Sequence, residues 1–456
     1  MAKSNKLVTR RKFLGSISAA AVATPFIMNS AVGLASPKNK LKHACIGVGG
    51  MGWHDLQNFK EHQGVEIVAL CDVDAKNLQR ASELLPNART YTDWRELLEK
   101  EHDLIDSVNI TVPDHNHFAI AYRAIQNGKH VYCQKPMCHD VAEVRKLTEA
   151  SIKAGVVTQL GTQHASGKGD RLAVQWIKEG AIGKVKHVYL CSNRPAAIER
   201  YRLPGPRPAQ GEEVPSHLNW DLWIGTAPMR PYAADIYHPA IWRAWQDFGT
   251  GWSGDIGCHI FDAVWKGLGL KAPMSVSAKV QKSWRESSER NSDTWPQGDH
   301  ITWMFSGNEL TESDVLPVEW YDGEFYPPWE IQALYSGKPY PAESAMLIGT
   351  EGALLIPHTD MPVLLPEKKY IDYKAPELDD PNHYHHFVDA CLGGEKTESH
   401  FAQSGPMTEA ILLGTVAIRL PDTLLEWDAV KMRFSDRRAN KYLHREYRKG
   451  WKVAGF

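Results

Sequence analysis

The stretch from Lys42 to Asp74 constrains the fold of this chain most. An apolar run leads into a turn with several glycines, a helix-like segment follows, and a second apolar run at 65–71 ends on an acid, Asp72. This order is typical of a dinucleotide-binding unit, in which the glycines permit a tight turn, let backbone N–H groups approach a diphosphate and let the helix pack closely on the strand. The predicted cofactor contacts in the turn are Gly47, Gly49, Gly50, Met51 and Gly52.

Asp72 indicates which dinucleotide the turn accepts. It lies 20 residues after Gly52, where a carboxylate can accept hydrogen bonds from the hydroxyls of an adenosine ribose. The same charge would repel a 2′-phosphate, so NAD is favoured over NADP. A glycine motif alone occurs by chance in many loops, but the two strands, the helix and the acid together favour nucleotide binding.

Strand and helix patterns alternate from Asp72 to Leu160 and predict a parallel, doubly wound sheet, with ligands at the carboxyl ends of the strands. Two polar segments fall at such ends, PDHNH at 113–117 and QKPM at 134–137. They add further predicted cofactor contacts: Val112, Pro113, His117, Gln134 and Lys135. We place this Rossmann domain at residues 41–162.

Residues 163–456 have a different character and are predicted to form a second, α/β domain. A long segment rich in Pro, Arg and Trp, at 194–231, suggests binding, since long loops in compact domains are often functional. Later alternating patterns predict a large, mostly antiparallel, open sheet. Its strands are expected at 275–281, 300–305, 316–321, 345–348 and 353–357. Two helices should follow, at 384–392 and at 406–420, with Pro406 in the first turn of the second.

The first 36 residues predict an export signal. Arg10 and Arg11 precede a moderately apolar, alanine-rich stretch that Pro25 interrupts and that ends in small residues. This pattern is typical of a cleaved twin-arginine signal. The alternative, an arginine pair before a membrane anchor, is disfavoured because the stretch is short and broken. We therefore expect a periplasmic or otherwise exported protein without stable membrane insertion.

Charge and metal-ligand patterns argue against several classes of protein. The formal net charge of −2 gives no electrostatic reason to expect a nucleic-acid partner. The seven cysteines are scattered and predict neither a disulfide framework nor a zinc site. His383, His385 and His386 lack matching acidic or cysteine partners, so we expect a solvated or pocket-edge helix start there and no metal. The sixteen tryptophans could stack on sugar rings, although core packing should account for most of them.

Asp255 and His259 are the catalytic candidates of the second domain. They are four residues apart on a predicted helix and so share a face. An imidazole that a carboxylate orients can act as general base for an alcohol, and Lys135, expected beside the nicotinamide, can stabilise the developing negative charge. With a hydride acceptor, these groups would form a secondary-alcohol dehydrogenase site. The spacing alone leaves a helix cap and a core histidine equally open.

Five motifs carry a family resemblance: IGVGGMG, ALCDVD, TVPDHNHF, YCQKPM and GDIGCHIFD. Through them the chain resembles the Gfo/Idh/MocA family of NAD(P)-dependent sugar and inositol oxidoreductases, and especially its exported branch. The resemblance implies a Rossmann domain and an α/β domain whose open sheet often forms an oligomer interface, so a homo-oligomer is expected. The family's EKP lysine matches Lys135, and its ribose-binding acid matches Asp72. Its DxxxH pair matches Asp255 and His259.

Gln134 departs from the family pattern, which has glutamate at this position. An amide can still bind a ribose or orient the lysine, but the lost charge should leave Lys135 less biased towards the ammonium form. The resemblance further implies a sugar pocket on strand ends and on the long loop, lined by Gln163, His164, Asn193, Arg194, Trp223, Tyr232, Trp242 and Arg243. A structural ion pair is the alternative role for Arg243.

The resemblance implies hydride exchange between NAD and a secondary hydroxyl of a sugar or glycoside, with C3 as one candidate position, His259 as acid/base and Lys135 assisting. Because little free NAD is expected outside the cytoplasm, the cofactor should be tightly bound. An alternative is redox-neutral glycoside cleavage, in which the hydride returns after a leaving group has been eliminated. A protein that binds sugar and cofactor without turnover is a third possibility, which the complete Lys, Asp and His set disfavours.

Overall fold

The computed structural model describes residues 40–194 and 207–456. The predicted signal at 1–36 and part of the predicted binding loop, 195–206, lie outside the described residues. Within the described ranges, none of the helices combines the length and the apolarity needed to cross a membrane. All seven cysteines are buried and unpaired.

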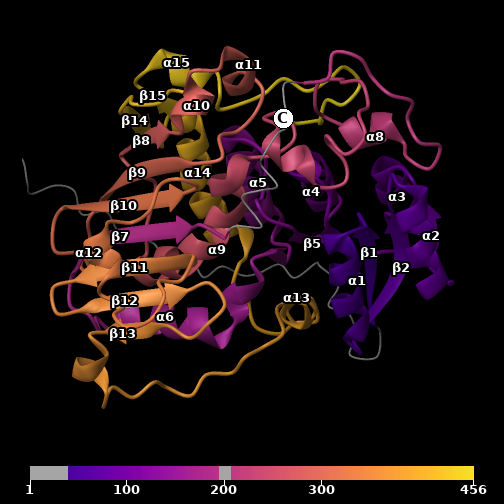
Figure 1. Cartoon of the computed structure of the whole chain (residues 1–456). Helices are drawn as coiled ribbons and strands as arrows, with labels where there is room; N and C mark the ends of the chain where they lie inside the picture. Colours follow the sequence, from indigo (N-terminus) through magenta and orange to yellow (C-terminus); the bar gives the residue numbers. More distant parts are fainter. Residues whose placement is uncertain (1–39, 195–206) are drawn as a thin grey trace, which may run out of the picture. The chain divides into compact units, whose positions relative to one another are not determined.

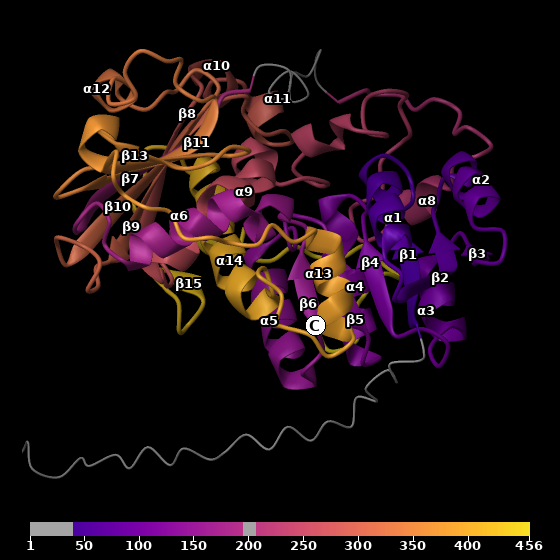
Figure 2. The same cartoon turned by 90° about the horizontal axis from the view of Figure 1, so that it is seen from below.

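The first sheet contains six parallel strands in the order β3-β2-β1-β4-β5-β6. Figure 1 labels β1, β2 and β5, and Figure 2 labels all six strands. The strands are β1 (Leu41–Ile46), β2 (Val65–Cys71), β3 (Arg89–Tyr91), β4 (Ser107–Ile110), β5 (His130–Cys133) and β6 (Thr158–Leu160). Strand order reverses between β1 and β4, and ligands bind in the crevice that such a reversal leaves at the carboxyl ends. The predicted doubly wound sheet is confirmed. The sequence missed β3, whose three residues are too few to show a pattern.

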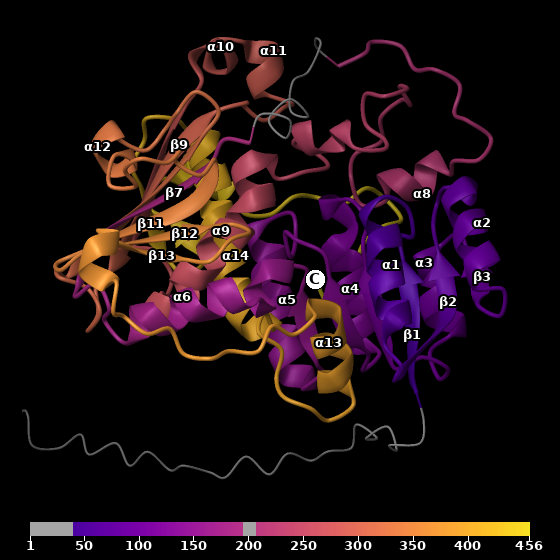
Figure 3. The ribbon, with the colours of Figure 1, turned by 60° about the horizontal axis from the view of Figure 1, so that its bottom comes forward.

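Five helices connect these strands: α1 (Met51–Glu61), α2 (Ala75–Leu84), α3 (Trp94–Lys100), α4 (His117–Gln126) and α5 (Val141–Ala154). Their ends follow local chemistry. A capping box between Asp140 and Glu143 begins α5, and Gly155 ends it in the left-handed conformation, with φ 66°. A later helix, α13 (His383–Cys391), packs beside α1 (Figure 3).

The second sheet has nine strands in the order β13-β12-β11-β7-β10-β9-β8-β14-β15. They are β7 (Val185–Ser192), β8 (Ser275–Val280), β9 (Asp299–Ser306), β10 (Val315–Asp322), β11 (Glu343–Gly349), β12 (Ala353–Pro357), β13 (Val363–Leu365), β14 (Leu425–Asp428) and β15 (Arg433–Phe434). Within it, β7 and β10 pair in parallel, and the other pairs are antiparallel. The predicted mostly antiparallel sheet is therefore confirmed.

Helices α6 (Lys168–Lys178), α9 (Gly251–Leu268) and α14 (Phe401–Ile418) cover one face of the second sheet. Viewed from below, they lie between this sheet and the strands of the first (Figure 2). Helix α14 also packs against α5, and one apolar cluster of buried residues runs through both domains. Through this core α9 is fixed beside the strand ends of the Rossmann sheet.

Two predicted helix starts differ from the structure. Helix α14 begins at Phe401, so Pro406 lies inside it and not in its first turn. The Phe401 N–H donates to Thr158 Oγ1 at 3.0 Å, and this cap from β6 lets the helix begin before the proline. Of the three histidines expected at a solvated or pocket-edge helix start, His383 begins α13 and is buried, and its ring contacts the Leu160 carbonyl (2.9 Å) and Ser166 Oγ (2.7 Å). His385 and His386 are half-buried.

Candidate active site

The glycine turn joins β1 to α1. A Cβ atom on Gly47 would lie 2.1 Å from the Thr111 carbonyl oxygen, and one on Gly52 would lie 2.1 Å from the Gly47 carbonyl oxygen, so neither position accepts a side chain. At Gly50, with φ 49°, nothing lies within 4 Å of the Cβ position. The turn is thus open at Gly50, directly before the N-terminus of α1. These residues fit a bound diphosphate.

Asp72, the residue directly after β2, is hydrogen-bonded to this turn. Its Oδ2 accepts hydrogen bonds from the N–H groups of residues 48–49 at 2.9 and 3.1 Å, and burial raises its pKa. The nearby Asp74 contacts His217 (3.1 Å) and His238 (3.5 Å) through their ring nitrogens. His217 comes from the long loop and His238 follows it in the chain, and the sequence did not connect either residue with the ribose end of the turn.

Gln134 donates to a buried carboxylate on α1. Its Nε2 lies 3.1 and 3.0 Å from the two carboxylate oxygens of Asp55. The hydroxyls of Thr111 and Tyr384 donate to the same carboxylate at 2.6 and 2.8 Å. Burial raises the pKa of Asp55, against the lowering effect of these donors. Asp55 was not among the predicted site residues, because only the tertiary fold brings it to Gln134.

Lys135 and Asp255 meet across the two domains. The Lys135 Nζ lies 2.6 Å from Asp255 Oδ1 and 3.1 Å from the Asp255 carbonyl oxygen. Arg243 Nε lies 3.4 Å from Asp255 Oδ2, so its ion pair is part of the site. The peptide bond between Lys135 and Pro136 is cis. Asp255 therefore places a carboxylate against the Lys135 amine, although residue 134 carries no charge.

A second carboxylate, Asp114, is buried near this contact, where Thr250 Oγ1 donates to it at 3.1 Å. Burial and the charge of Asp255 raise the pKa of Asp114 to about 8. Arg243 and Lys135 act in the opposite direction. The sequence placed Asp114 at a strand end but assigned it no role.

His259 follows Asp255 by one turn of α9, but its contacts differ from those expected. Its Nδ1 is buried without a hydrogen-bond partner among the described residues, and the carboxylate expected to orient it contacts Lys135. The His259 ring lies against His358, with centroids 4.9 Å apart. Burial lowers the pKa of His259 well below its usual value, as do its neighbours. The neutral imidazole is able to accept a proton.

The other predicted site residues fall into two groups. Near His259, the ring of His164 lies 5.0 Å from that of His358, and Arg194 Nε lies 3.5 Å from Glu343 Oε1. Several others have mainly structural contacts, as their hydrogen bonds and stacking partners show. Asn193 Nδ2 donates to the Phe325 carbonyl at 3.0 Å, Gln163 Nε2 contacts the Tyr132 and Tyr384 hydroxyls, and His117 bridges the carbonyls of Val112 and Pro136.

The aromatic residues of the predicted sugar pocket are buried. Trp223 stacks on Trp220, with centroids 4.7 Å apart, and Tyr232 meets Trp220 edge-on at 5.3 Å. The Trp223 ring also lies beside that of His115 on the Rossmann domain, with centroids 5.6 Å apart. Trp242 lies under the Arg243 guanidinium, 4.3 Å from its centre, and so supports the ion pair of Arg243.

Two family models cover most of the folded chain. One, described as an oxidoreductase family with NAD-binding Rossmann fold, matches residues 41–162. The other, described as the C-terminal alpha/beta domain of an oxidoreductase family, matches residues 177–328. The chain belongs to the Gfo/Idh/MocA family. This family is one of oxidoreductases with an NAD-binding Rossmann fold, and NAD is the cofactor of this chain.

Curated relatives match a limited part of this Gfo/Idh/MocA protein. A "Glycosyl hydrolase family 109 protein 1" of Shewanella sp. strain ANA-3 is 27% identical over 191 residues, which are 40% of this chain and 41% of the relative. An inositol 2-dehydrogenase of Salmonella paratyphi B is 28% identical over 167 residues, 36% of this chain and 49% of the relative. The chain thus spans less than half the length of either relative.

Solved structures share the Gfo/Idh/MocA fold over more of the chain. The WlbA dehydrogenase from Bordetella pertussis, crystallised with NADH and UDP-GlcNAcA, has a TM-score of 0.58 at 16% identity and covers 86% of this chain and 99% of its own. An inositol dehydrogenase homolog from Azotobacter vinelandii, complexed with NADH and myo-inositol, has a TM-score of 0.55 at 15% identity, covering 86% and 98%. At these identities the likeness establishes the fold only.

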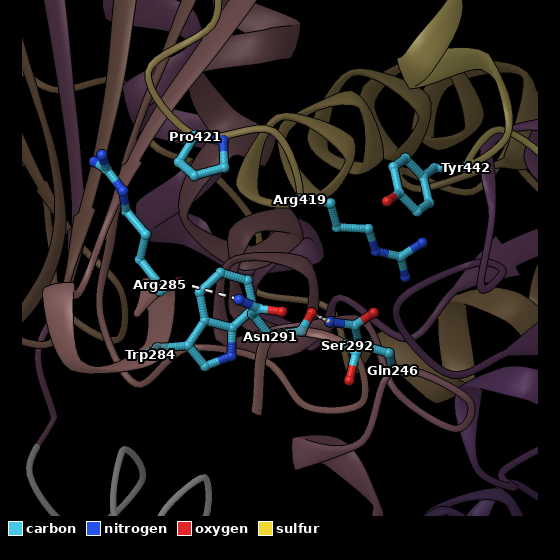
Figure 4. Close-up of a pocket in the computed structure, with 8 residues that line it drawn as sticks. All are labelled: Gln246, Trp284, Arg285, Asn291, Ser292, Arg419, Pro421 and Tyr442. Atoms are coloured by element: carbon cyan, nitrogen blue, oxygen red, sulfur yellow. Dashed lines mark hydrogen bonds between the residues drawn. The ribbon is translucent and has the colours of Figure 1, made fainter. Parts of the chain in front are cut away.

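A separate cavity of about 340 Å³ shares no residue with the predicted site (Figure 4). Gln246, Trp284 and Arg419 are among its lining residues. The Arg419 guanidinium lies over the rings of Trp295 (4.7 Å) and Tyr442 (4.9 Å), and burial lowers its pKa to about 10. We assign this cavity no part in hydride transfer.

Proposed function

We propose that this protein transfers hydride between NAD and a secondary hydroxyl of a sugar or glycoside, with His259 as acid/base and Lys135 as the group that holds the hydroxyl. The contact of 2.6 Å between Lys135 and Asp255 is the observation that carries this proposal. It brings an amine, a carboxylate and, one turn later on α9, an imidazole to the carboxyl end of β5, where a Rossmann fold holds the nicotinamide.

Each residue has a distinct task in the proposed reaction. NAD, when bound, supplies the hydride acceptor. The Lys135 ammonium donates to the substrate hydroxyl and stabilises the negative charge that develops on its oxygen. His259 accepts the hydroxyl proton, and its Nε2 is the nitrogen left for this because Nδ1 is buried. Asp255 holds Lys135 in place and is itself held by Arg243.

The proposal includes tight binding of NAD, export and self-association. The long loop supports tight binding, since the Asn219 N–H donates to the Val73 carbonyl at 2.9 Å and His217 reaches Asp74. This loop therefore crosses the ribose end of the dinucleotide site. Native mass spectrometry of protein purified from the export compartment tests all three points. Recovery from that compartment tests export, and comparison of the native masses with those after denaturation tests bound NAD and self-association.

A redox-neutral glycosidase is the second candidate, favoured by the likeness to family 109 glycosyl hydrolases. In this reaction the sugar is first oxidised, and the carbon next to the new carbonyl then loses a proton. The aglycone leaves, water adds in its place, the proton returns to carbon and the hydride returns to the carbonyl carbon. The net result is hydrolysis without consumption of NAD.

Aryl glycosides separate these functions. Purified protein with its bound NAD is incubated with an aryl glucoside and, separately, with the 3-keto form of that glucoside. The dehydrogenase proposal predicts interconversion of hydroxyl and keto sugar with the aglycone retained, whereas the glycosidase releases the aglycone from both substrates. Sugar binding in calorimetry without either product, across a panel of sugars, would contradict both and favour a binding protein.

A further inference from the structure

We propose that Glu343 and His358 are positioning residues for His259. The three side chains form a relay in which the Glu343 carboxylate acts on the His358 imidazole, and this imidazole acts on the imidazole of His259. The relay sets which nitrogen of His259 carries the proton and how strongly the ring binds a second one. This inference rests on the proposed role of His259 and deepens it.

Glu343 is fixed at the start of β11. Its Oε1 accepts a hydrogen bond from Ser192 Oγ at 2.8 Å, and its Oε2 lies 3.3 Å from His358 Nδ1. Burial alone would raise the pKa of Glu343, but the hydrogen bonds from His358 and Ser192 hold it below its usual value. Because a charged carboxylate can only accept, His358 carries its proton on Nδ1, and its Nε2 is an acceptor.

The relay is completed by two unsatisfied nitrogens. His358 Nε2 and His259 Nδ1 are both buried and have no hydrogen-bond partner among the described residues. They belong to rings whose centroids lie 4.9 Å apart, a separation that a small ring rotation can close to an N–H···N bond. A buried polar atom without a partner is costly. A bond from His259 Nδ1–H to His358 Nε2 satisfies both atoms and leaves the Nε2 lone pair of His259 for substrate.

The charge of Glu343 then acts on His259 through one ring. As His259 accepts a proton from substrate, the carboxylate stabilises the positive charge that forms. Other titratable groups also act on His259, namely Lys135 after β5, His164 on the 3-10 turn Gln163–Ser166 and His383 on α13. Asp255 lies one turn before His259 on α9, and Arg194 Nε lies 3.5 Å from Glu343 Oε1. Without the Glu343 charge, His259 becomes a weaker base with a lower pKa, so the acid limb of the pH profile moves to lower pH.

The test is the pH dependence of kcat/KM for sugar oxidation in E343Q, which removes the charge and keeps the shape of the side chain. We expect the acid limb to move down by about half a pH unit or more, and kcat at neutral pH to fall about tenfold, since a general base contributes 10² to 10⁴ in all. H358N should give a similar profile, and the double variant should lose little more, because both substitutions break the same relay.

Glu319 provides the matched control. It lies on the opposite face of the same sheet, where its carboxylate contacts His187 at 2.8 Å and His300 at 2.6 Å. E319Q removes a carboxylate from an imidazole contact of the same kind and should leave the acid limb in place. Melting temperature and bound NAD verify that each variant is folded.

Three results overturn the inference in distinguishable ways. If H259A retains full activity, the proposed function fails and the relay fails with it. If H259A is inactive while E343Q and H358N keep the parent's acid limb, the relay alone is wrong. If H164Q moves the acid limb of the pH profile and H358N does not, the ring that acts on His259 is His164. This result would also overturn the inference.

Discussion

Gln134 and Lys135 are adjacent in the chain, yet each meets a carboxylate of a different kind. Asp55, against Gln134, is satisfied by neutral donors from an amide and two hydroxyls. Asp255, against Lys135, contacts two cations. The difference shows that the neutral Gln134 amide can hydrogen-bond to the buried Asp55 carboxylate. A glutamate at position 134 would instead add another carboxylate, which would compete with Asp255 for the Lys135 amine. In the proposed function, Gln134 belongs to the cofactor side of the crevice and Lys135 to the reacting hydroxyl.

Removal of the Lys135 amine should have the largest effect, which is a loss of activity. K135A removes the donor to the developing oxyanion, so we expect sugar oxidation to fall about a thousandfold, while the protein still carries NAD. Turnover and the NAD released on denaturation are measured together. K266A, which breaks a similar buried pair with Asp262 at 2.6 Å on α9, is the control and should keep activity within about tenfold. Equal losses in both variants would contradict the account.

Restoring the family's glutamate at position 134 should lower the unfolding free energy, through its contact with Asp55 on the cofactor side of the crevice. Q134E sets a second carboxylate against Asp55, and two buried carboxylates in contact should cost about 2 to 4 kcal/mol of unfolding free energy at neutral pH. The folded pair has a raised pKa, so the loss is smallest in acid and grows as the pH rises through that value. Urea unfolding at several pH values measures it. D55N combined with Q134E should recover most of the loss, and a double variant no better than Q134E would refute the pairing.

A third expected effect is the pH dependence of stability that Asp114 contributes, because its pKa is raised to about 8. A carboxyl with a raised folded pKa stabilises the fold fully below its unfolded pKa and loses that contribution as the pH rises through the folded value. The unfolding free energy of the parent should therefore decline between about pH 5 and pH 8, by at most about 1.4 kcal/mol per unit from this group. D114N should show a flatter decline in the same urea experiments. Identical slopes would show that Asp114 ionises normally.

Local patterns in the sequence were enough for much of this fold. The glycine turn, the alternating strands and helices and the capped ends of α5 all depend on residues close together in the chain. The partners of Gln134 and His259 were not found, because Asp55, Glu343 and His358 approach them through tertiary packing. One signal was available: β11 and β12 pair antiparallel with Ser344 opposite Pro357, and one more step places Glu343 opposite His358.

The start of α14 shows the same limit. Pro406 is a reasonable first-turn residue by local rules, but a hydroxyl from β6, far away in sequence, caps Phe401 and begins the helix earlier. Tertiary packing also gives Asp255 a contact that helix spacing alone could not reveal. Asp255 lies one turn before His259 on α9, and Lys135 approaches its carboxylate from the other domain.

Transfer of a labelled hydrogen tests the central claim most directly. An aryl glucoside with deuterium at the carbon to be oxidised is mixed with protein in excess, and the NAD released on denaturation is weighed by mass spectrometry after a single turnover. The account predicts deuterium in the bound cofactor of the parent and none in that of K135A, although both carry NAD. Two results would contradict the account. One is a cofactor that stays unlabelled in the parent with every labelled sugar tried, and the other is a cofactor that is labelled equally in the parent and in K135A.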